Sequence, residues 1–196
     1  MKSNWILLIA LLLLTFQLHA QDGSSREIGL RATNLNSFGL IYKKQLSENT
    51  YRRYRLAFGT LSANFINSST IVGFSVGGAI GKEKRRPLSD KLQAVYGTEL
   101  ITSIGLNSSS TGNLTIDNGN GNTATYTGNS IVVVTPSVGI GFVIGAQYSI
   151  NPKWYVSAEL IPSIAVSGSF GSGASIYSLQ AGFNSSSAGL TGAYRF

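Results

Sequence analysis

The chemistry open to this chain is limited by the side chains that it lacks. The sequence has no cysteine, and its one histidine, His19, lies in an amino-terminal segment typical of export signals. Without imidazole or thiol, neither a Ser-His-Asp nor a Cys-His nucleophile can be assembled, and the usual ligands of zinc and haem are missing. Disulfide bonds are excluded as well. We therefore expect no enzymatic activity, no metal site and no cofactor.

Four charged residues remain as candidates for chemistry. They are Arg31, Arg55, Glu99 and Glu159, and each stands on the polar side of an alternating segment. If those segments form a barrel whose polar face points inward, all four enter its interior at intermediate depth. They would then form either an ion path or a set of salt bridges that fills the interior, because an unpaired buried charge is costly. We favour the salt bridges, since two cations balance two anions. Three further cations, Lys43, Arg53 and Lys153, are also expected to point inward, nearer the periplasmic mouth of the barrel, where water can reach them.

The elements that would position these side chains follow from an alternation of apolar and polar residues. Between positions 130 and 151 most even-numbered residues are apolar and most odd-numbered ones are small or polar. A period of two is typical of a β-strand, not of a helix. The same pattern predicts eight strands, at residues 26–34, 37–46, 51–64, 69–83, 91–106, 130–150, 153–168 and 176–196. An even number permits antiparallel closure of a barrel with both ends of the chain on one side.

The last predicted strand changes phase along its length. Its apolar positions are odd at Tyr177 and Leu179 but even at Leu190 and Tyr194. A β-bulge at residues 184–187 would reset the register. Otherwise residues 176–184 belong to the preceding loop.

Export is indicated by the first twenty residues. A lysine, an apolar run from Ile6 to Phe16 and a small residue at Ala20 predict a signal peptide, residues 1–20, that is cleaved on maturation. The remaining residues 21–196 carry 14 basic and 8 acidic side chains, which suffices for one domain of net charge +6. No later apolar run approaches the roughly 18 residues of a membrane-spanning helix. An exported chain of this kind is either soluble or a membrane β-barrel.

Aromatic residues favour the membrane barrel. If the amino-terminal ends of the odd strands are periplasmic, the aromatic rings gather near strand ends on that side, as expected where rings lie among lipid head groups. A soluble barrel has no reason to collect its rings at one end. The predicted girdle consists of Tyr42, Tyr54, Tyr96, Tyr148, Trp154, Tyr194 and Phe196, with Tyr51 and Tyr155 beside them. The expected fold is therefore an all-β, eight-stranded antiparallel transmembrane barrel.

The same orientation sorts the connections by length. Residues 46–50 and 151–152 become short periplasmic turns, and residues 107–129 become the main external loop, in which 18 of 23 residues are Ser, Thr, Asn or Gly. Alternation on both sides of the loop tip predicts a hairpin that extends beyond the bilayer. Asp117 is the one carboxylate near the tip, so we expect a plain turn there and no calcium site.

One periplasmic connection, residues 82–91, is unusually long and basic. Its cations are Lys82, Lys84, Arg85, Arg86 and Lys91. Nucleic acid is not an expected partner, because an exported turn would not meet it and no aromatic residue separates the charges. Two interpretations stay open: contact with lipid phosphates, a periplasmic partner or the cell wall, or a turn that is simply solvated. In the first, Lys44 and Arg52 would snorkel alongside.

The export signal, the eight amphipathic strands and the terminal Tyr194-Arg195-Phe196 resemble the small outer-membrane β-barrels of the OmpA/OmpX type. The resemblance covers the whole chain after the signal. It implies residence in the outer membrane of a Gram-negative bacterium, in contact with outer-membrane lipid. It also implies that the barrel-assembly machinery reads the last strand through Phe196 and Tyr194. Nothing follows Phe196, so no periplasmic peptidoglycan-binding domain is expected.

These observations predict a monomeric structural or surface-interaction protein whose polar loops face the exterior. An extracellular or cell-wall partner fits this interpretation, although the sequence does not identify one. The alternative is a narrow channel for ions or very small solutes, suggested by small interior residues such as Gly139 and Gly141. Those glycines also suit tight coiling of the strands and space for the arginines.

Overall fold

The computed structural model describes residues 25–34, 37–66, 69–110, 112–117, 123–128, 131–171, 174–183 and 187–196. The predicted signal peptide and the tip of the predicted external loop, residues 118–122, lie outside this part of the chain. Within it, no helix is long and apolar enough to cross a membrane.

The described residues form an all-β fold. The strands are β1 (Arg26–Asn34), β2 (Ser37–Ser47), β3 (Thr50–Ile66), β4 (Ser69–Pro87), β5 (Leu92–Ser109), β6 (Gly112–Asp117), β7 (Thr123–Gly128), β8 (Ile131–Ser149), β9 (Trp154–Leu160), β10 (Ser163–Gly171), β11 (Ala174–Gly182) and β12 (Ala188–Arg195).

Eight of these strands close into a barrel. The hydrogen-bonded order is β8-β5-β4-β3-β2-β1-β12-β9, and β9 pairs with β8 to complete the ring. Every neighbouring pair in it is antiparallel. Where β1 meets β12, the Arg26 amide donates a hydrogen bond to the Phe196 carbonyl over 3.0 Å, and the Phe196 amide donates to the Arg26 carbonyl over 2.9 Å. The predicted eight-stranded antiparallel barrel is thus confirmed.

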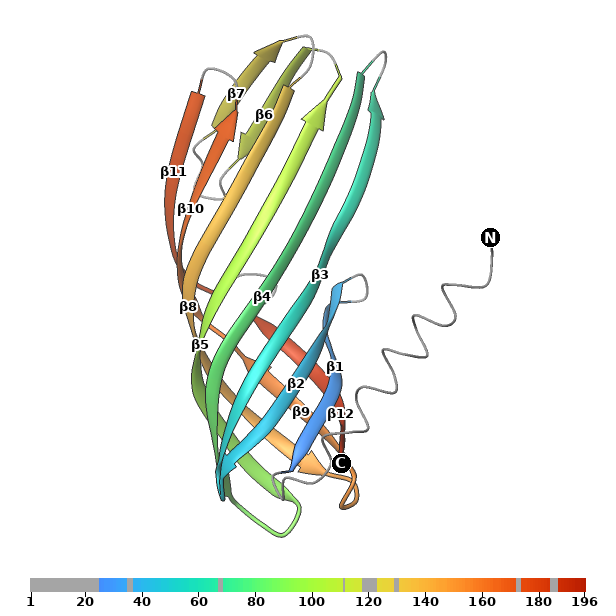
Figure 1. The fold of residues 1–196 in the computed structure, drawn as a ribbon, viewed down its shortest axis with the longest axis vertical. Helices are drawn as coiled ribbons and strands as arrows, with labels where there is room; N and C mark the ends of the chain where they lie inside the picture. Colours follow the sequence, from blue (N-terminus) through green and yellow to red (C-terminus); the bar gives the residue numbers. More distant parts are fainter. Residues whose placement is uncertain are drawn as a thin grey trace, which may run out of the picture.

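Above this ring the wall continues on one side only. β3, β4, β5, β8, β10 and β11 form a tall sheet, while β1 and β2 are short, so the upper part of the molecule is an open wall standing on a closed barrel (Figure 1). We call the end of the barrel at which β1 begins and β12 ends the lower end, as it is drawn there.

Two predicted strands are each divided into two. The predicted strand 153–168 breaks between β9 and β10 at Pro162, which has no amide hydrogen to donate to a ladder. The predicted strand 176–196 breaks between β11 and β12, and this break accounts for the change of phase. Both Leu179 in β11 and Leu190 in β12 are exposed on the outer face. Of the proposed bulge, residues 184–186 lie outside the described residues.

The predicted hairpin in the long loop is confirmed by the pairing of β6 with β7. It does not stand free of the wall. Tyr126 of β7 is 1% exposed and packs with Ile131 and Val133 on the inner face of β8. Its hydroxyl donates to the Ser169 carbonyl over 3.3 Å. The hairpin therefore covers the concave side of the upper wall.

The two faces of the barrel have opposite polarity. One row of mutually opposed residues on the outer face is wholly apolar or aromatic: Ile28, Tyr42, Tyr54, Ile80, Leu100, Ile140 and Ile164. The adjacent row on the inner face is charged or small: Glu27, Lys43, Arg53, Gly81, Glu99, Gly141 and Ser163. Alternation along each strand produces this inversion, because successive side chains point to opposite faces.

Candidate functional site: a buried salt-bridge network

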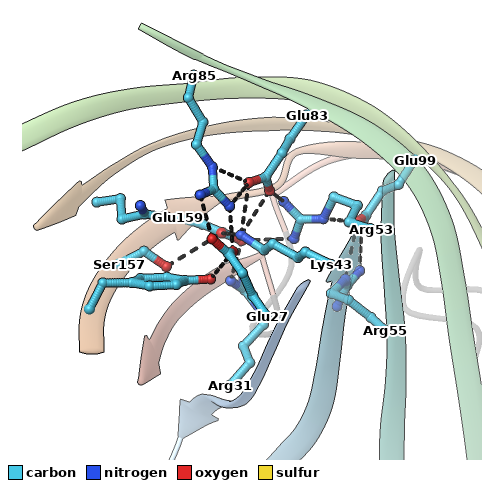
Figure 2. Close-up of polar contacts among 12 residues, drawn as sticks. Glu27, Arg31, Lys43, Arg53, Arg55, Glu83, Arg85, Glu99, Ser157 and Glu159 are labelled. Carbon is cyan, nitrogen blue, oxygen red and sulfur yellow. Dashed lines mark hydrogen bonds and ion pairs between the residues drawn. The ribbon is translucent and has the colours of Figure 1, made fainter. Parts of the chain in front are cut away.

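The four charged residues singled out in the sequence lie in the barrel interior as two ion pairs. Arg31 Nη1 lies 3.0 Å from Glu159 Oε2, and Arg55 Nε donates to Glu99 Oε2 over 3.1 Å. Arg53 joins the two pairs, because its Nη2 lies 2.8 Å from Glu159 and its Nε 3.2 Å from Glu99. Figure 2 shows these side chains converging from separate strands.

The centre of the network consists of cations and a carboxylate that were not among the four candidates. Lys43 Nζ lies 2.8 Å from Glu83 and 3.5 Å from Glu159. Arg53 Nη1 lies 3.1 Å from Glu83. The side chains of Lys43 and Arg53 are fully buried, so the expectation that water reaches them near the barrel mouth was wrong. Lys153, expected to point inward with them, is exposed in the turn before β9.

A lower layer is organised around Glu27. Its two carboxylate oxygens accept from Arg85 over 2.7 and 2.6 Å in a bidentate pair, which adds geometric specificity to the attraction. The Tyr155 hydroxyl donates to the same carboxylate over 2.7 Å, and Arg195 Nε lies 3.2 Å away. The Arg85 guanidinium also stacks on Tyr51, 3.6 Å from the ring centroid.

Two aromatic residues of the predicted girdle therefore belong to the interior. Tyr51 is 9% exposed and Tyr155 is 1% exposed, whereas the girdle required both at the outer surface. Successive residues of a strand point to opposite faces of the sheet. Each of the two tyrosines is adjacent in sequence to an outward-facing residue, as Tyr155 is to Trp154, and therefore points inward. The other seven rings, which are Tyr42, Tyr54, Tyr96, Tyr148, Trp154, Tyr194 and Phe196, are exposed or half-buried on the outer side.

Several outer rings touch one another. The centroids of Tyr42 and Tyr54 are 6.0 Å apart, and those of Trp154 and Tyr194 are 5.0 Å apart. Tyr194 also stacks on Phe196 at 6.5 Å. These contacts join rings on neighbouring strands into two clusters on the lower part of the outer wall.

The predicted basic turn is mostly strand. β4 continues to Pro87 and pairs with β5 from Ile71 to that residue, so the turn is confined to residues 88–91. Within the predicted segment Arg85 points inward together with Glu83, while Lys82, Lys84 and Arg86 point outward and Lys91 is exposed in the turn. The sequence carried no polarity signal for this arrangement, because residues 82–86 are all charged and the alternation of apolar and polar residues ends at Gly81.

The network does not balance its charges as two against two. Its ion pairs join six cations to four carboxylates, the cations being Arg31, Lys43, Arg53, Arg55, Arg85 and Arg195 and the carboxylates Glu27, Glu83, Glu99 and Glu159. Each of these four carboxylates therefore pairs with at least two cations. Among the described residues, no three His, Cys, Asp or Glu side chains are grouped so that they could hold a metal ion.

Glycines make room for the buried carboxylates. Glu99 lies directly across the sheet from Gly81 and Gly141, Glu83 from Gly97, and Glu159 from Gly145 and Gly189. A Cβ atom added at Gly81 would lie 2.6 Å from that of Glu99, a separation that requires the sheet to shift. An eight-stranded interior is only wide enough for its own side chains, so small residues must alternate with long ones.

Replacing Gly81 with alanine should therefore destabilise the barrel by about 1 to 3 kcal/mol, the usual cost of overpacking. The measurement is the urea midpoint of the protein folded in phospholipid vesicles. Gly192→Ala is the matched control, because nothing lies within 4 Å of a Cβ atom added there. Equal midpoints for the two variants would contradict this account of the glycines.

Cavities lie on both sides of the network. An upper cavity of about 430 Å³ is bounded by Arg31 and Arg55, with serine hydroxyls from several strands around it. A lower cavity of about 540 Å³ is bounded by Arg85 and Arg195 and by the turn that carries Lys91. The buried ion pairs occupy the interior between them.

No family model matches the chain, and a comparison with curated proteins found no match. Among solved structures, the chain is similar to the N-terminal β-barrel domain of Pseudomonas aeruginosa OprF, with 11% identity over 88% of this chain and 96% of that one and a TM-score of 0.39. It is also similar to Acinetobacter baumannii CarO, with 11% identity, 88% and 96% coverage and a TM-score of 0.36. A third similar structure is Ail, the attachment invasion locus protein of Yersinia pestis, with 14% identity, 88% and 97% coverage and a TM-score of 0.37.

The fold can be assigned from the structure of the chain itself. Its eight antiparallel strands close into a ring, its outer face is apolar, and its inner face carries buried ion pairs. Soluble barrels have the reverse arrangement, with the apolar face inside. The chain has the fold of the small eight-stranded outer-membrane β-barrels.

Proposed function

We propose that the protein is an integral outer-membrane β-barrel of structural or surface-interaction type, with its interior closed by the salt-bridge network. The observation that carries the proposal is the inverted polarity of the wall. Leu30, Ile144 and Leu160 are 61%, 58% and 48% exposed on the outside, while Lys43 and Arg53 are completely buried inside. An apolar belt of this extent is costly in water and favourable in hydrocarbon.

Closure of the backbone supports the same environment. In hydrocarbon each unpaired amide or carbonyl costs several kcal/mol, so a sheet can cross a bilayer only as a closed barrel. The ring described above has no free edge, since β1 pairs with both β2 and β12 and β9 pairs with both β12 and β8. The outer rings near the lower end suit the periplasmic interface of the membrane, where Trp and Tyr are favoured.

The upper wall supports a role at the cell surface. It rises at the end away from the start of β1 and the end of β12, and the β6–β7 hairpin packs against it (Figure 1). In this orientation the top of the wall and the hairpin lie on the external side of the membrane and present hydroxyl-rich segments to the exterior. The proposal includes no catalytic step, because no histidine or cysteine occurs after residue 20.

A narrow channel for ions or very small solutes is the second candidate function. The cavities above and below the network favour it, because they shorten the filled part of the interior that a solute would have to cross. Conduction would require these buried ion pairs to exchange partners and open. We prefer the structural role, since each broken pair would leave a charge uncompensated in the interior.

One preparation tests both candidates. The protein without residues 1–20 is folded into phosphatidylcholine vesicles, and we expect it to migrate faster on a gel before boiling than after boiling. In cells, we expect to recover the native protein in the outer-membrane fraction. Vesicles fused with a planar bilayer should then show no unit conductance. Recovery in the soluble periplasmic fraction would reject the membrane proposal. Stable conductance that changes in Glu99→Gln would favour the channel.

A further inference from the structure

Six cations lie on the outer wall near its lower end, and we call them the basic patch. They are Arg26, Lys44, Arg52, Lys82, Lys84 and Arg86. The first four form one cross-strand row, since Arg26 pairs with Lys44, Lys44 with Arg52, and Arg52 with Lys82. Residues opposed in this way have Cβ atoms about 4.5 to 5.5 Å apart. The patch is therefore a continuous array of positive charge across β1 to β4.

Among the residues that the structure describes, no carboxylate forms an ion pair with the patch. Like charges directly opposed across a sheet destabilise it. None of the ion pairs formed by described residues includes a member of the patch, and the carboxylates of those pairs are buried inside the barrel. Glu48 and Asp90 are exposed in turns and form no ion pair in this part of the chain. An anion from outside the protein would remove the repulsion.

The position of the patch along the barrel axis indicates the source of this anion. The next outer row toward the upper end is Ile28, Tyr42, Tyr54 and Ile80, on the same four strands. A row of cations directly below an apolar and aromatic row matches the order of head groups and hydrocarbon in a leaflet. Lys82 and its neighbours have stems long enough to reach that level by snorkelling.

We propose that the basic patch binds the anionic head groups of phospholipids in the periplasmic leaflet. The inference rests on the proposed insertion of the barrel in the outer membrane. Several cations on one smooth wall can contact several phosphates at once, and anionic lipid surfaces attract such clusters. On the opposite side of the ring, β8, β9 and β12 carry Tyr148, Trp154 and Tyr194 at the corresponding end. Anionic lipid should therefore gather on the β1 to β4 side.

The test compares lipids retained by the folded protein. The protein is equilibrated with equal amounts of phosphatidylglycerol and phosphatidylcholine of the same acyl chains, and bound lipid is counted by native mass spectrometry. We expect the wild type to retain phosphatidylglycerol in about tenfold preference, a preference that weakens as salt is raised. The variant Lys44→Gln/Arg52→Gln/Lys82→Gln should lose it. The control Lys91→Gln/Lys153→Gln, which removes two exposed turn cations, should keep it.

Each other outcome has a definite meaning. If the wild type has no preference for phosphatidylglycerol but migrates as a folded barrel, the lipid inference is rejected while membrane insertion stands. A preference that survives in the triple variant also rejects it, because the lipid then binds elsewhere. If the wild type does not fold into phosphatidylcholine vesicles at all, the proposed function itself fails.

Discussion

Replacing Glu159 with glutamine is expected to destabilise the barrel by about 3 to 5 kcal/mol, the cost of leaving buried charges without their partner. The Glu159 carboxylate lies 3.0 Å from Arg31, 2.8 Å from Arg53 and 3.5 Å from Lys43. The network already has more cations than carboxylates, so the loss of one carboxylate increases an existing excess of positive charge. The measurement is the urea midpoint in phosphatidylcholine vesicles, read from heat-modifiable gel migration.

Two further variants make this result interpretable. Glu48→Gln removes an exposed carboxylate in the β2–β3 turn and should change the free energy of unfolding by less than about 0.5 kcal/mol. If Glu159→Gln does not fold, the double variant Arg31→Gln/Glu159→Gln should recover part of the stability. The Arg31→Gln substitution removes one of the three cations that lost their carboxylate partner. An Arg31→Gln/Glu159→Gln variant no more stable than Glu159→Gln alone would contradict the coupling.

Deleting residues 192–196 is expected to abolish barrel assembly. β12 is the strand that joins the two ends of the ring, with Tyr194 opposite Ile28 of β1 on one side and Trp154 of β9 on the other. Without these residues β1 and β9 would each expose an unpaired edge in hydrocarbon, at several kcal/mol for every orphaned backbone group. The deletion also removes Arg195, a partner of Glu27. Loss of the fast-migrating folded form in unboiled samples is the readout.

Phe196→Tyr is the matched control for the closing strand. It preserves a ring that can stack on Tyr194 and a backbone that can pair with Arg26, so folding should be retained. Normal heat-modifiable migration of the truncated protein would mean that the barrel closes through some other strand, and the topology described above would have to be abandoned.

The sequence alone was sufficient to determine the fold class and the facing of most residues. Alternation is a local property, because neighbouring side chains in a strand point to opposite sides whatever the strand pairs with. It therefore placed Arg31, Arg55, Glu99 and Glu159 inside and Ile140 and Ile144 outside without knowledge of the register. The β6–β7 hairpin was predictable for the same reason, since its two strands are adjacent in the chain.

Only the tertiary structure decided which charges meet. Arg31 and Glu159 are 128 residues apart, and Arg53 reaches Glu159 only because the ring closes and brings β3 and β9 to the same interior. Strand ends were equally non-local. Residues 82–86 are all charged, and they form a strand because β5 is long enough to pair with them; this pairing places Glu83 and Arg85 inside. Register and strand length depend on partners distant in the chain, so no local pattern contains them.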